Sequence, residues 1–160
     1  MNNPKIVLFD IDYTLFDTKA FKDSKLKNYY LYEEVLHVLE ELVKVAELGI
    51  FSMGDTEFQN RKLVETGIAN YFKDKNVHVF SDKEVKLKDM LDKYQQYKVF
   101  LVDDRLTVLH NAKTMMPSIF TIWVKRGPFA QVQGTIPGFA PNSEVFDLNE
   151  IIKIIKSQKD

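Results

Sequence analysis

The chain has 160 residues, of which 45% are apolar and 28% charged, and this suits one globular domain with its own hydrophobic core. The composition excludes intrinsic disorder, and a formal net charge of −1 provides no global field to recruit nucleic acid or an anionic membrane. A local basic patch stays open, so nucleic acid is disfavoured as a partner rather than excluded. The absence of cysteine removes disulfides, thiolate nucleophiles and thiolate metal ligands.

The chain carries no pattern that would direct it to a membrane. No segment is apolar for long enough to span a bilayer, and Asp10 and Asp12 interrupt the only apolar run near the amino terminus. A signal peptide and a membrane partner are therefore not predicted. We expect a cytoplasmic protein.

The first predicted element is a strand over Ile6–Phe9, where successive apolar residues are typical of a strand buried on both faces. It delivers Asp10 and Asp12 to its carboxyl end. Because side chains at i and i+2 of an extended chain point the same way, the two carboxylates should converge. Like charges that close are costly unless one is protonated or a cation lies between them. The pair therefore indicates chemistry rather than core building.

Strand and helix signals alternate along the rest of the chain. A lysine-rich polar stretch, Asp17–Asn28, is expected to be a solvated loop, and 127–142, with late Gly and Pro breakers, is expected to be loop as well. Further strands are predicted over 50–53, 77–80, 99–102 and 119–124. A first helix is predicted over about 32–48 and ends at Gly49, and a second begins at a cap, Asp55 or Thr56, and ends at about 66, before Gly67. Three further helices are predicted: 83–94, one from the acidic pair to about 115, and 147–156.

This alternation predicts a three-layer α/β/α fold with a central parallel sheet, formed by a single domain over residues 1–160. In such sheets the site lies beyond the carboxyl ends of the strands. Polar side chains that could carry chemistry lie at the ends of four of the predicted strands or shortly after them. They are Asp10, Asp12, Ser52, Lys83, Asp103 and Asp104.

Three segments resemble motifs of the haloacid dehalogenase superfamily of phosphatases and phosphotransferases, across roughly residues 5–156. Phe9-Asp10-Ile11-Asp12-Tyr13-Thr14-Leu15 is similar to the family's first motif, an apolar strand followed by Asp-x-Asp-x-Thr-Leu. Gly49–Asp55 fits the second motif, a strand ending in Ser or Thr, although Ser52-Met53 stands where the family often has Thr-Asn. Val102-Asp103-Asp104-Arg105 fits the acidic pair of the fourth motif. The resemblance implies the Rossmann-like core of that superfamily.

The third motif of the family is a lysine, and Lys83 and Lys86 compete for it. Lys83 lies one turn before Leu87, almost in line with the inward face of its helix. Lys86 falls about 90° from that face, at about 100° per residue. We favour Lys83 and keep Lys86 as the alternative.

The resemblance implies a Mg²⁺-dependent phosphatase that hydrolyses a phosphate monoester through an aspartyl-phosphate. Asp10 is implied as the nucleophile. Asp12 is implied as the acid that protonates the leaving group and the base that deprotonates water, for which a carboxyl of suitably raised pKa is needed. The implied magnesium ligands are Asp10, the backbone carbonyl of Asp12 and Asp104. Asp103 either binds the ion directly or contacts one of its ligands.

The phosphoryl group has its own implied partners. Ser52 would donate a hydrogen bond to a phosphoryl oxygen, and the amides around Met53 and Gly54, ahead of a helix, would offer further donors. Lys83 would neutralise charge on the transferring group and on Asp10. Two alternatives stay open: phosphotransfer to an acceptor other than water, and a catalytically weak binding module on the same fold.

A separate cap domain, which many relatives carry, is not predicted, because the inserts at 17–31 and 67–76 are too short to fold alone. We expect a site that is open or covered by a small loop or a neighbouring subunit. The expected partner is a phosphorylated substrate, either a small ester or an exposed phosphate on a larger molecule. The oligomeric state and the identity of the substrate stay open.

A few residues are expected to have no part in the reaction. Arg61-Lys62 is interpreted as a solvated helix face and Trp123 as part of a strand core. Arg105, beside the acidic pair, either contacts substrate or neutralises the pair. The histidines share no ligand spacing and are interpreted as structural or exposed; they are His37, His78 and His110.

Overall fold

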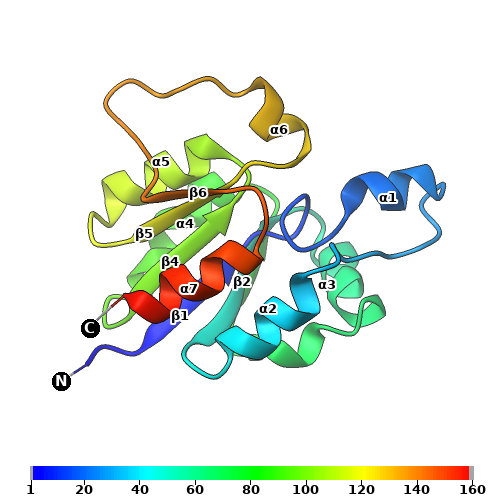
Figure 1. Cartoon of the computed structure of the whole chain (residues 1–160), viewed down its shortest axis with the longest axis horizontal. Helices are drawn as coiled ribbons and strands as arrows, with labels where there is room; N and C mark the ends of the chain where they lie inside the picture. The colour runs from blue at the N-terminus through cyan, green and yellow to red at the C-terminus, as the bar shows by residue number, and fades with distance from the viewer. Residues whose placement is uncertain (1, 159–160) are drawn as a thin grey trace.

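The computed structural model describes residues 2–158, which contain a sheet of six parallel strands in the order β3-β2-β1-β4-β5-β6. β1 (Lys5–Phe9) lies in the middle, between β2 (Glu47–Met53) and β4 (Lys98–Asp103). Helices cover both faces of the sheet (Figure 1). The predicted three-layer α/β/α fold with a central parallel sheet is therefore confirmed.

Each face of the sheet has its own hydrophobic core, and β1 contributes to both. Val7 and Phe9 belong to one core, while Ile6 and Leu8 belong to the other, as the alternation of side chains along a strand requires. The helices that pack against the first core are α2 (Val35–Leu42), α3 (Thr56–Glu65) and α7 (Asn149–Ser157). Those against the second are α4 (Lys83–Asp92) and α5 (Leu106–Met115).

The predicted helix over 32–48 is wrong in its second half. α2 ends at Leu42, and β2 begins at Glu47, which pairs with Ile6 of β1. Gly49 lies inside β2 instead of ending a helix, and a Cβ there would come 2.7 Å from the carbonyl oxygen of Asn76. Tertiary pairing with β1 thus overrides the helical periodicity of this segment.

The outer strands are β3 (Val77–Phe80), β5 (Phe120–Val124) and β6 (Ser143–Val145). β6 was not predicted, because three residues with one buried apolar side chain carry little strand signal. Two single 3₁₀ turns, Ala69–Tyr71 and Asp74–Asn76, lead into β3. Among the described residues, no helix combines the length and the apolar character needed to cross a bilayer.

Two short helices, α1 (Thr18–Asp23) and α6 (Gly127–Val132), stand where loops were predicted. The carboxylate of Asp17 caps α1 by accepting a hydrogen bond from the Ala20 amide at 2.9 Å. α6 has a proline in its first turn, where the missing N–H is no loss. Both helices lie beyond the carboxyl ends of the central strands (Figure 1), so they border the edge where polar side chains were expected to gather.

Candidate active site

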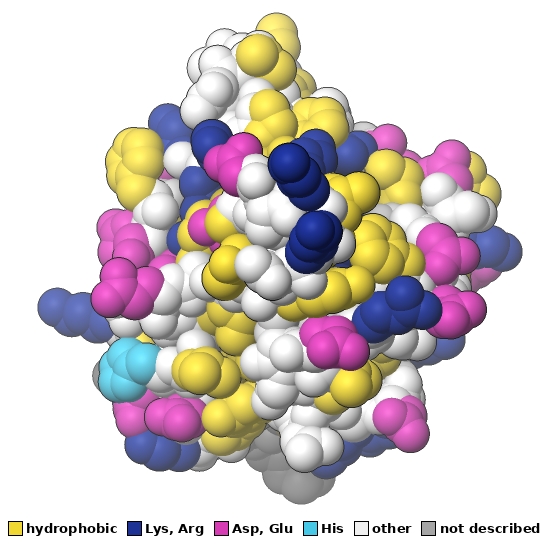
Figure 2. All heavy atoms as spheres, turned by 90° about the vertical axis from the view of Figure 1, so that its right-hand side faces the viewer, with side chains coloured by type: hydrophobic (Ala, Val, Ile, Leu, Met, Phe, Trp, Pro, Cys, Tyr) yellow, Lys and Arg dark blue, Asp and Glu magenta, His cyan; other side chains and the backbone are white. Residues whose placement is uncertain are grey.

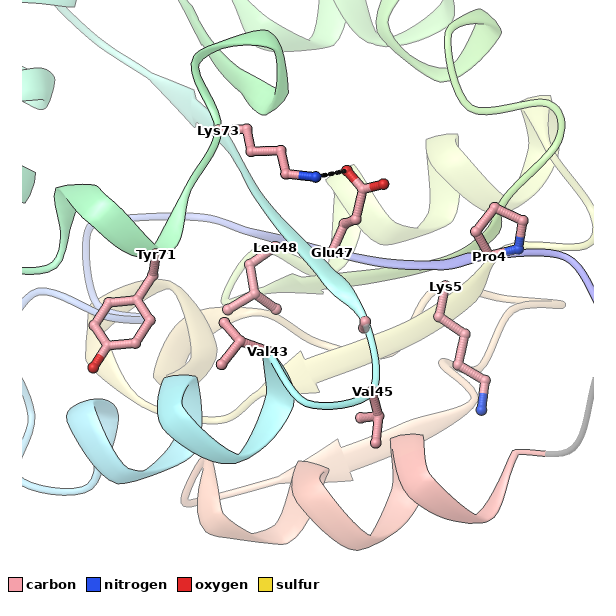
Figure 3. A pocket seen from close by; sticks show the side chains of 9 residues that line it. Pro4, Lys5, Val43, Val45, Glu47, Leu48, Tyr71 and Lys73 are labelled. Atoms are coloured by element: carbon pink, nitrogen blue, oxygen red, sulfur yellow. Dashed lines mark ion pairs between the residues drawn. The ribbon is translucent and has the colours of Figure 1, made fainter.

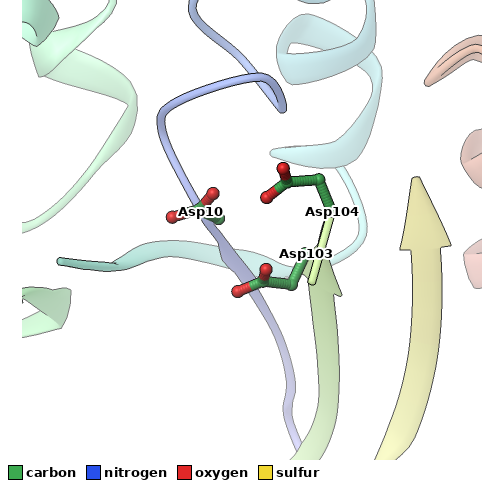
Figure 4. A group of neighbouring side chains, drawn as sticks. All are labelled: Asp10, Asp103 and Asp104. Carbon is green, nitrogen blue, oxygen red and sulfur yellow. The ribbon is translucent and has the colours of Figure 1, made fainter. Parts of the chain in front are cut away.

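Three aspartates meet at the carboxyl ends of the two central strands. Asp10 follows β1, Asp103 is the last residue of β4, and Asp104 comes next. The Asp10 amide donates to the carbonyl of Val102 at 3.0 Å, which carries the strand pairing one residue past β1 and holds the two chain segments together. One carboxylate oxygen from each aspartate lies within 4.8 Å of the others, and all three residues are buried (Figure 4).

Lys83, the first residue of α4, reaches this cluster from the other side. Its Nζ donates to Asp103 Oδ2 at 2.6 Å and to Asp10 Oδ1 at 3.1 Å. The Asp82 side chain caps α4 by accepting from the Glu84 amide at 3.1 Å, which fixes the helix start that carries Lys83. Lys86 is exposed. The structure therefore places Lys83, not Lys86, beside Asp10.

Burial and mutual repulsion dominate the electrostatics of the cluster. Burial raises the pKa of Asp10 to about 6, although Lys83 acts in the opposite direction. Burial, together with the charges of Asp10 and Asp103, raises the pKa of Asp104 to about 10. Burial alone would lower the pKa of Lys83, but Asp10 and Asp103 raise it above its usual value. One ammonium group thus faces three carboxyl groups, and the cluster is short of positive charge.

The donor set of the cluster fits a hard divalent cation. Asp104 Oδ2 is buried and has no hydrogen-bond partner within residues 2–158. Asp103 has less to offer, because Oδ2 accepts from Lys83 and Oδ1 accepts from the Arg105 amide at 2.8 Å. Carboxylate oxygens are the ligands that Mg²⁺ prefers. An ion bound by Asp10 and Asp104 would supply the missing positive charge.

Asp12 lies outside this cluster and has a separate set of partners. Its Oδ1 accepts hydrogen bonds from Lys62 Nζ at 2.7 Å and from Thr18 Oγ1 at 2.9 Å. Its Oδ2 accepts from Gln59 Nε2 at 3.0 Å. The Asp12 side chain is 30% exposed, so it keeps access to the adjacent cavity while three donors fix its orientation. The two aspartates of the first motif are therefore not equivalent.

Lys62 corrects the interpretation of Arg61-Lys62 as a solvated helix face. Arg61 is exposed, but Lys62 is buried, with Nζ 4.5 Å from the centre of the Phe58 ring. The residues of α3 that point inward are Gln59, Lys62 and Leu63. Their i, i+3, i+4 spacing is the signal that could have placed Lys62 inside, by the same reasoning that favoured Lys83.

The second motif is close to the cluster but is arranged differently from what was expected. Ser52 is buried, and its Oγ accepts from Gln59 Nε2 at 2.8 Å. Met53 lines the neighbouring cavity. The Gly54 amide donates to the carbonyl of Phe80 at 2.9 Å, so the expectation that it is free for a phosphoryl oxygen is wrong.

A cavity of about 210 Å³ opens beside the carboxylates. Helix α1 contributes Thr18 and Lys22 to its wall, and α6 contributes Phe129. Its other lining residues are Asp10, Asp12, Tyr13, Met53, Lys83, Asp104 and Arg105. On the face of the molecule that Figure 2 presents, lysine and arginine side chains gather in the upper middle.

Gly127 allows the start of α6 to pack against the first motif. Its φ is +80°, and a Cβ there would lie 2.6 Å from Cγ of Tyr13. Tyr13 itself has a φ of 59°, which is uncommon for a residue with a side chain. The loop after β1 and the start of α6 are therefore in direct contact at the rim of the cavity.

A different cavity, of about 430 Å³, lies at the amino ends of β1 and β2 and is shown in Figure 3. Its lining includes Lys5, Val45, Tyr71 and the ion pair of Glu47 with Lys73, at 3.5 Å. The acid of this cavity is already paired, and the aspartate cluster is at the other end of the sheet. This cavity therefore offers no comparable chemistry.

Comparison with known proteins gives similarity at the level of structure. No family model matches the sequence, and no curated protein matches it. A protein of Burkholderia xenovorans LB400, assigned as a haloacid dehalogenase-like hydrolase, superposes with a TM-score of 0.78 and 18% identity, over 95% of this chain and 96% of the other.

Two further structures show the same arrangement. L-2-haloacid dehalogenase of Xanthobacter autotrophicus, with chloropropionic acid covalently bound, gives a TM-score of 0.76 at 13% identity, over 98% of this chain and 100% of the other. YfnB of Bacillus subtilis, assigned as a HAD hydrolase and bound to magnesium, gives a TM-score of 0.73 at 14% identity, over 96% of this chain and 99% of the other. Identities this low establish the architecture alone. The chain has the fold of the haloacid dehalogenase-like hydrolases.

Proposed function

We propose that this chain is a Mg²⁺-dependent phosphatase that hydrolyses a phosphate monoester through an aspartyl-phosphate on Asp10. The observation that carries the proposal is the division of labour between two aspartates beside one cavity. Asp10 lies 3.1 Å from a buried lysine within a carboxylate cluster, while Asp12 is held apart by Lys62, Thr18 and Gln59. A nucleophile and a separate proton carrier are what phosphoryl transfer through a covalent intermediate needs.

In the first step, an oxygen of Asp10 attacks phosphorus, and the bond from phosphorus to the ester oxygen breaks. Lys83 favours the ionised form of Asp10 and offsets negative charge on the transferring group. Asp103 holds the Lys83 ammonium in place through the 2.6 Å contact. Asp12, protonated at this stage, gives its proton to the departing ester oxygen and regains one from water in the second step.

In the second step, water loses a proton to Asp12 and attacks the phosphorus of the aspartyl-phosphate. The bond between phosphorus and the Asp10 oxygen breaks, which releases inorganic phosphate and restores the carboxylate. Asp10, Asp104 and the backbone carbonyl of Asp12 would hold Mg²⁺, with Asp103 supporting Lys83. When bound, the ion supplies positive charge that reduces the repulsion between the Asp10 carboxylate and the phosphate.

Similar structures include an L-2-haloacid dehalogenase, which makes carbon–halogen cleavage the competing reaction. A departing halide needs no proton, whereas an alkoxide does. Asp12 is a second carboxyl group, held in position beside the cavity by three side-chain donors, and a second positioned carboxyl supports a reaction in which a proton must be moved. In the proposal, the chain acts as a single core domain without a separate cap, and α1 and α6 take over the covering of the site.

The test is hydrolysis of 4-nitrophenyl phosphate with Mg²⁺ and with EDTA, by the wild-type protein, Asp10→Asn and the exposed control Asp23→Asn. We expect turnover by the wild type and the control only with Mg²⁺, and a loss of at least about a thousandfold in Asp10→Asn. Turnover that survives both EDTA and Asp10→Asn would contradict the proposal. Inactivity toward a broad panel of phosphate esters, in a folded protein that binds Mg²⁺, would favour the binding-module alternative.

A further inference from the structure

We propose that the substrate is a small phosphate ester carrying a second oxyanion, a carboxylate or a further phosphoryl group, which Arg105 and Lys22 bind. The inference rests on the proposed function and names the class of substrate for that same site. It is carried by two cations that line the cavity and have no acidic partner among residues 2–158.

Arg105 provides the first cation. Its guanidinium carbon lies 3.9 Å from the centre of the Phe129 ring, and the residue lines the cavity. Across residues 2–158 its side chain forms neither an ion pair nor a hydrogen bond with another residue. A guanidinium stacked by its face keeps its N–H edge free, and that edge matches a carboxylate or phosphate with two parallel hydrogen bonds.

The other two arginines of the sequence are paired, which makes Arg105 the exception. Arg126 also stacks on a ring, 3.7 Å from the centre of Tyr32, but it donates to Glu34 at 2.6 Å. Arg61 donates to Glu57 at 3.0 Å. Arg126 shows that an arginine of this protein can stack on a ring and form an ion pair at the same time. Arg105 stacks without an ion pair, so its N–H edge is available for a ligand.

Lys22, in the last turn of α1, provides the second cation. Its Nζ lies 3.4 Å from Tyr13 Oη and has no carboxylate within ion-pair distance in the part of the chain that the structure describes. One turn earlier, Lys19 is paired with Asp23 at 2.5 Å. Of these two lysines of α1, the one that lines the cavity, Lys22, has no carboxylate partner among residues 2–158.

In the proposed reaction, Lys83 and the Mg²⁺ that the aspartate cluster would hold offset the charge of the transferring phosphate. Arg105 and Lys22 exceed that requirement, so they match additional negative charge on the same ligand. The cavity of about 210 Å³ favours a small ligand, since pockets for drug-sized molecules span about 300–1,000 Å³. A compact ester with a second oxyanion satisfies both the charge and the volume.

The test compares kcat/KM for propyl phosphate with that for 2-carboxyethyl phosphate and for propane-1,3-diyl bisphosphate, at fixed Mg²⁺. We expect the wild-type protein to prefer at least one doubly anionic ester by tenfold or more, mainly through KM. The preference ratio should fall below threefold in Arg105→Gln and fall partly in Lys22→Gln. The controls Arg61→Gln and Lys19→Gln should retain it. A wild-type protein without preference, or a preference that survives both cavity variants, overturns the inference.

A binding measurement separates this inference from the proposed function. Asp10→Asn is titrated calorimetrically with the same esters in the presence of Mg²⁺, which needs no turnover. Tighter binding of a doubly anionic ester, lost on adding Arg105→Gln, supports the inference even if no ester is hydrolysed. Equal affinity for all three esters, or no binding of any, overturns it.

Discussion

The ammonium group of Lys62 lies 2.7 Å from Asp12 Oδ1, and only 5% of the lysine side chain is exposed. This contact ties helix α3 to the loop after β1, far apart in sequence. Gln59, one turn earlier on the same helix, reaches both Asp12 Oδ2 and Ser52 Oγ. The helix after the second motif thus positions the second aspartate of the first motif.

Lys62→Met should lower activity in a way that depends on the leaving group. Without the contact from Lys62, Asp12 is no longer held in position for proton transfer, and an alkoxide needs that proton more than a nitrophenolate does. We expect kcat/KM to fall about 10²–10⁴-fold for an alkyl phosphate and less for 4-nitrophenyl phosphate. Steady-state kinetics with both esters measures the difference, and Arg61→Met on the same helix is the control. An equal loss with the two esters would argue against a role through Asp12.

Lys83→Met should destabilise the protein strongly. Removing one partner of a buried ion pair leaves an uncompensated charge, which costs about 3–5 kcal/mol. Urea unfolding in EDTA measures the loss, and Lys86→Met, at an exposed position three residues on, should leave the free energy of unfolding within about 0.5 kcal/mol. The double variant Lys83→Met/Asp103→Asn should recover part of the stability, since the nearest carboxylate is then neutral. A Lys83→Met protein as stable as the wild type would show that the cluster does not need this lysine.

Asp104→Asn should be more stable than the wild type in EDTA. The raised pKa of Asp104 means that the folded protein must keep a proton that the unfolded chain releases above its ordinary value of 3.8. This penalty grows as pH rises from 4 to 8, so the advantage of the variant in free energy of unfolding should grow with it, to at least about 1 kcal/mol. Added Mg²⁺ should stabilise the wild type and not the variant. Equal stabilisation of both proteins by Mg²⁺ would place the ion elsewhere.

His78 should make stability depend on pH in the acidic range, between pH 6.5 and about 4. Its ring is buried, with Nε2 2.6 Å from Tyr94 Oη, and burial lowers its pKa from 6.5 to about 4. The unfolded chain therefore takes up a proton first, so this contribution to stability is present above pH 6.5 and is lost as pH falls toward 4. Relative to His78→Gln, the wild type should lose roughly 3 kcal/mol over that interval.

Urea unfolding of both proteins between pH 4 and 7.5 measures this loss. The exposed His37 provides the control, because His37→Gln should follow the wild type at every pH. If wild type and His78→Gln lose stability in parallel, the titration belongs to other groups.

The sequence predicted the positions of residues at strand ends better than those held by tertiary contacts. Asp10, Asp103 and Asp104 each follow or end a parallel strand, and strand order alone brings such residues together. The choice of Lys83 over Lys86 followed from a helical face, and its contact with Asp10 agrees with that choice. These features depend on local periodicity, which a sequence carries directly.

The remaining features depend on which surfaces meet. Whether a lysine on a polar helix is solvated or buried depends on the segment packed against it, and for Lys62 that segment is the loop around Asp12. α1 and α6 are too short to show a helical period, and β6 contributes strand pairing through only three residues. Such elements form because β5 or the rim of the cavity supports them, so the sequence pattern alone could not predict them.

The central claim is a covalent phosphoryl group on Asp10, and trapping that intermediate tests it most directly. The protein is mixed with a ³²P-labelled phosphate ester and Mg²⁺, quenched in acid within its first turnover, and mapped by peptide mass spectrometry after hydroxylamine treatment of a parallel sample. We predict an acid-stable, hydroxylamine-labile label on Asp10 that is absent in Asp10→Asn. Labelling of a different residue, or release of phosphate in the first turnover with no label on the protein, would contradict it.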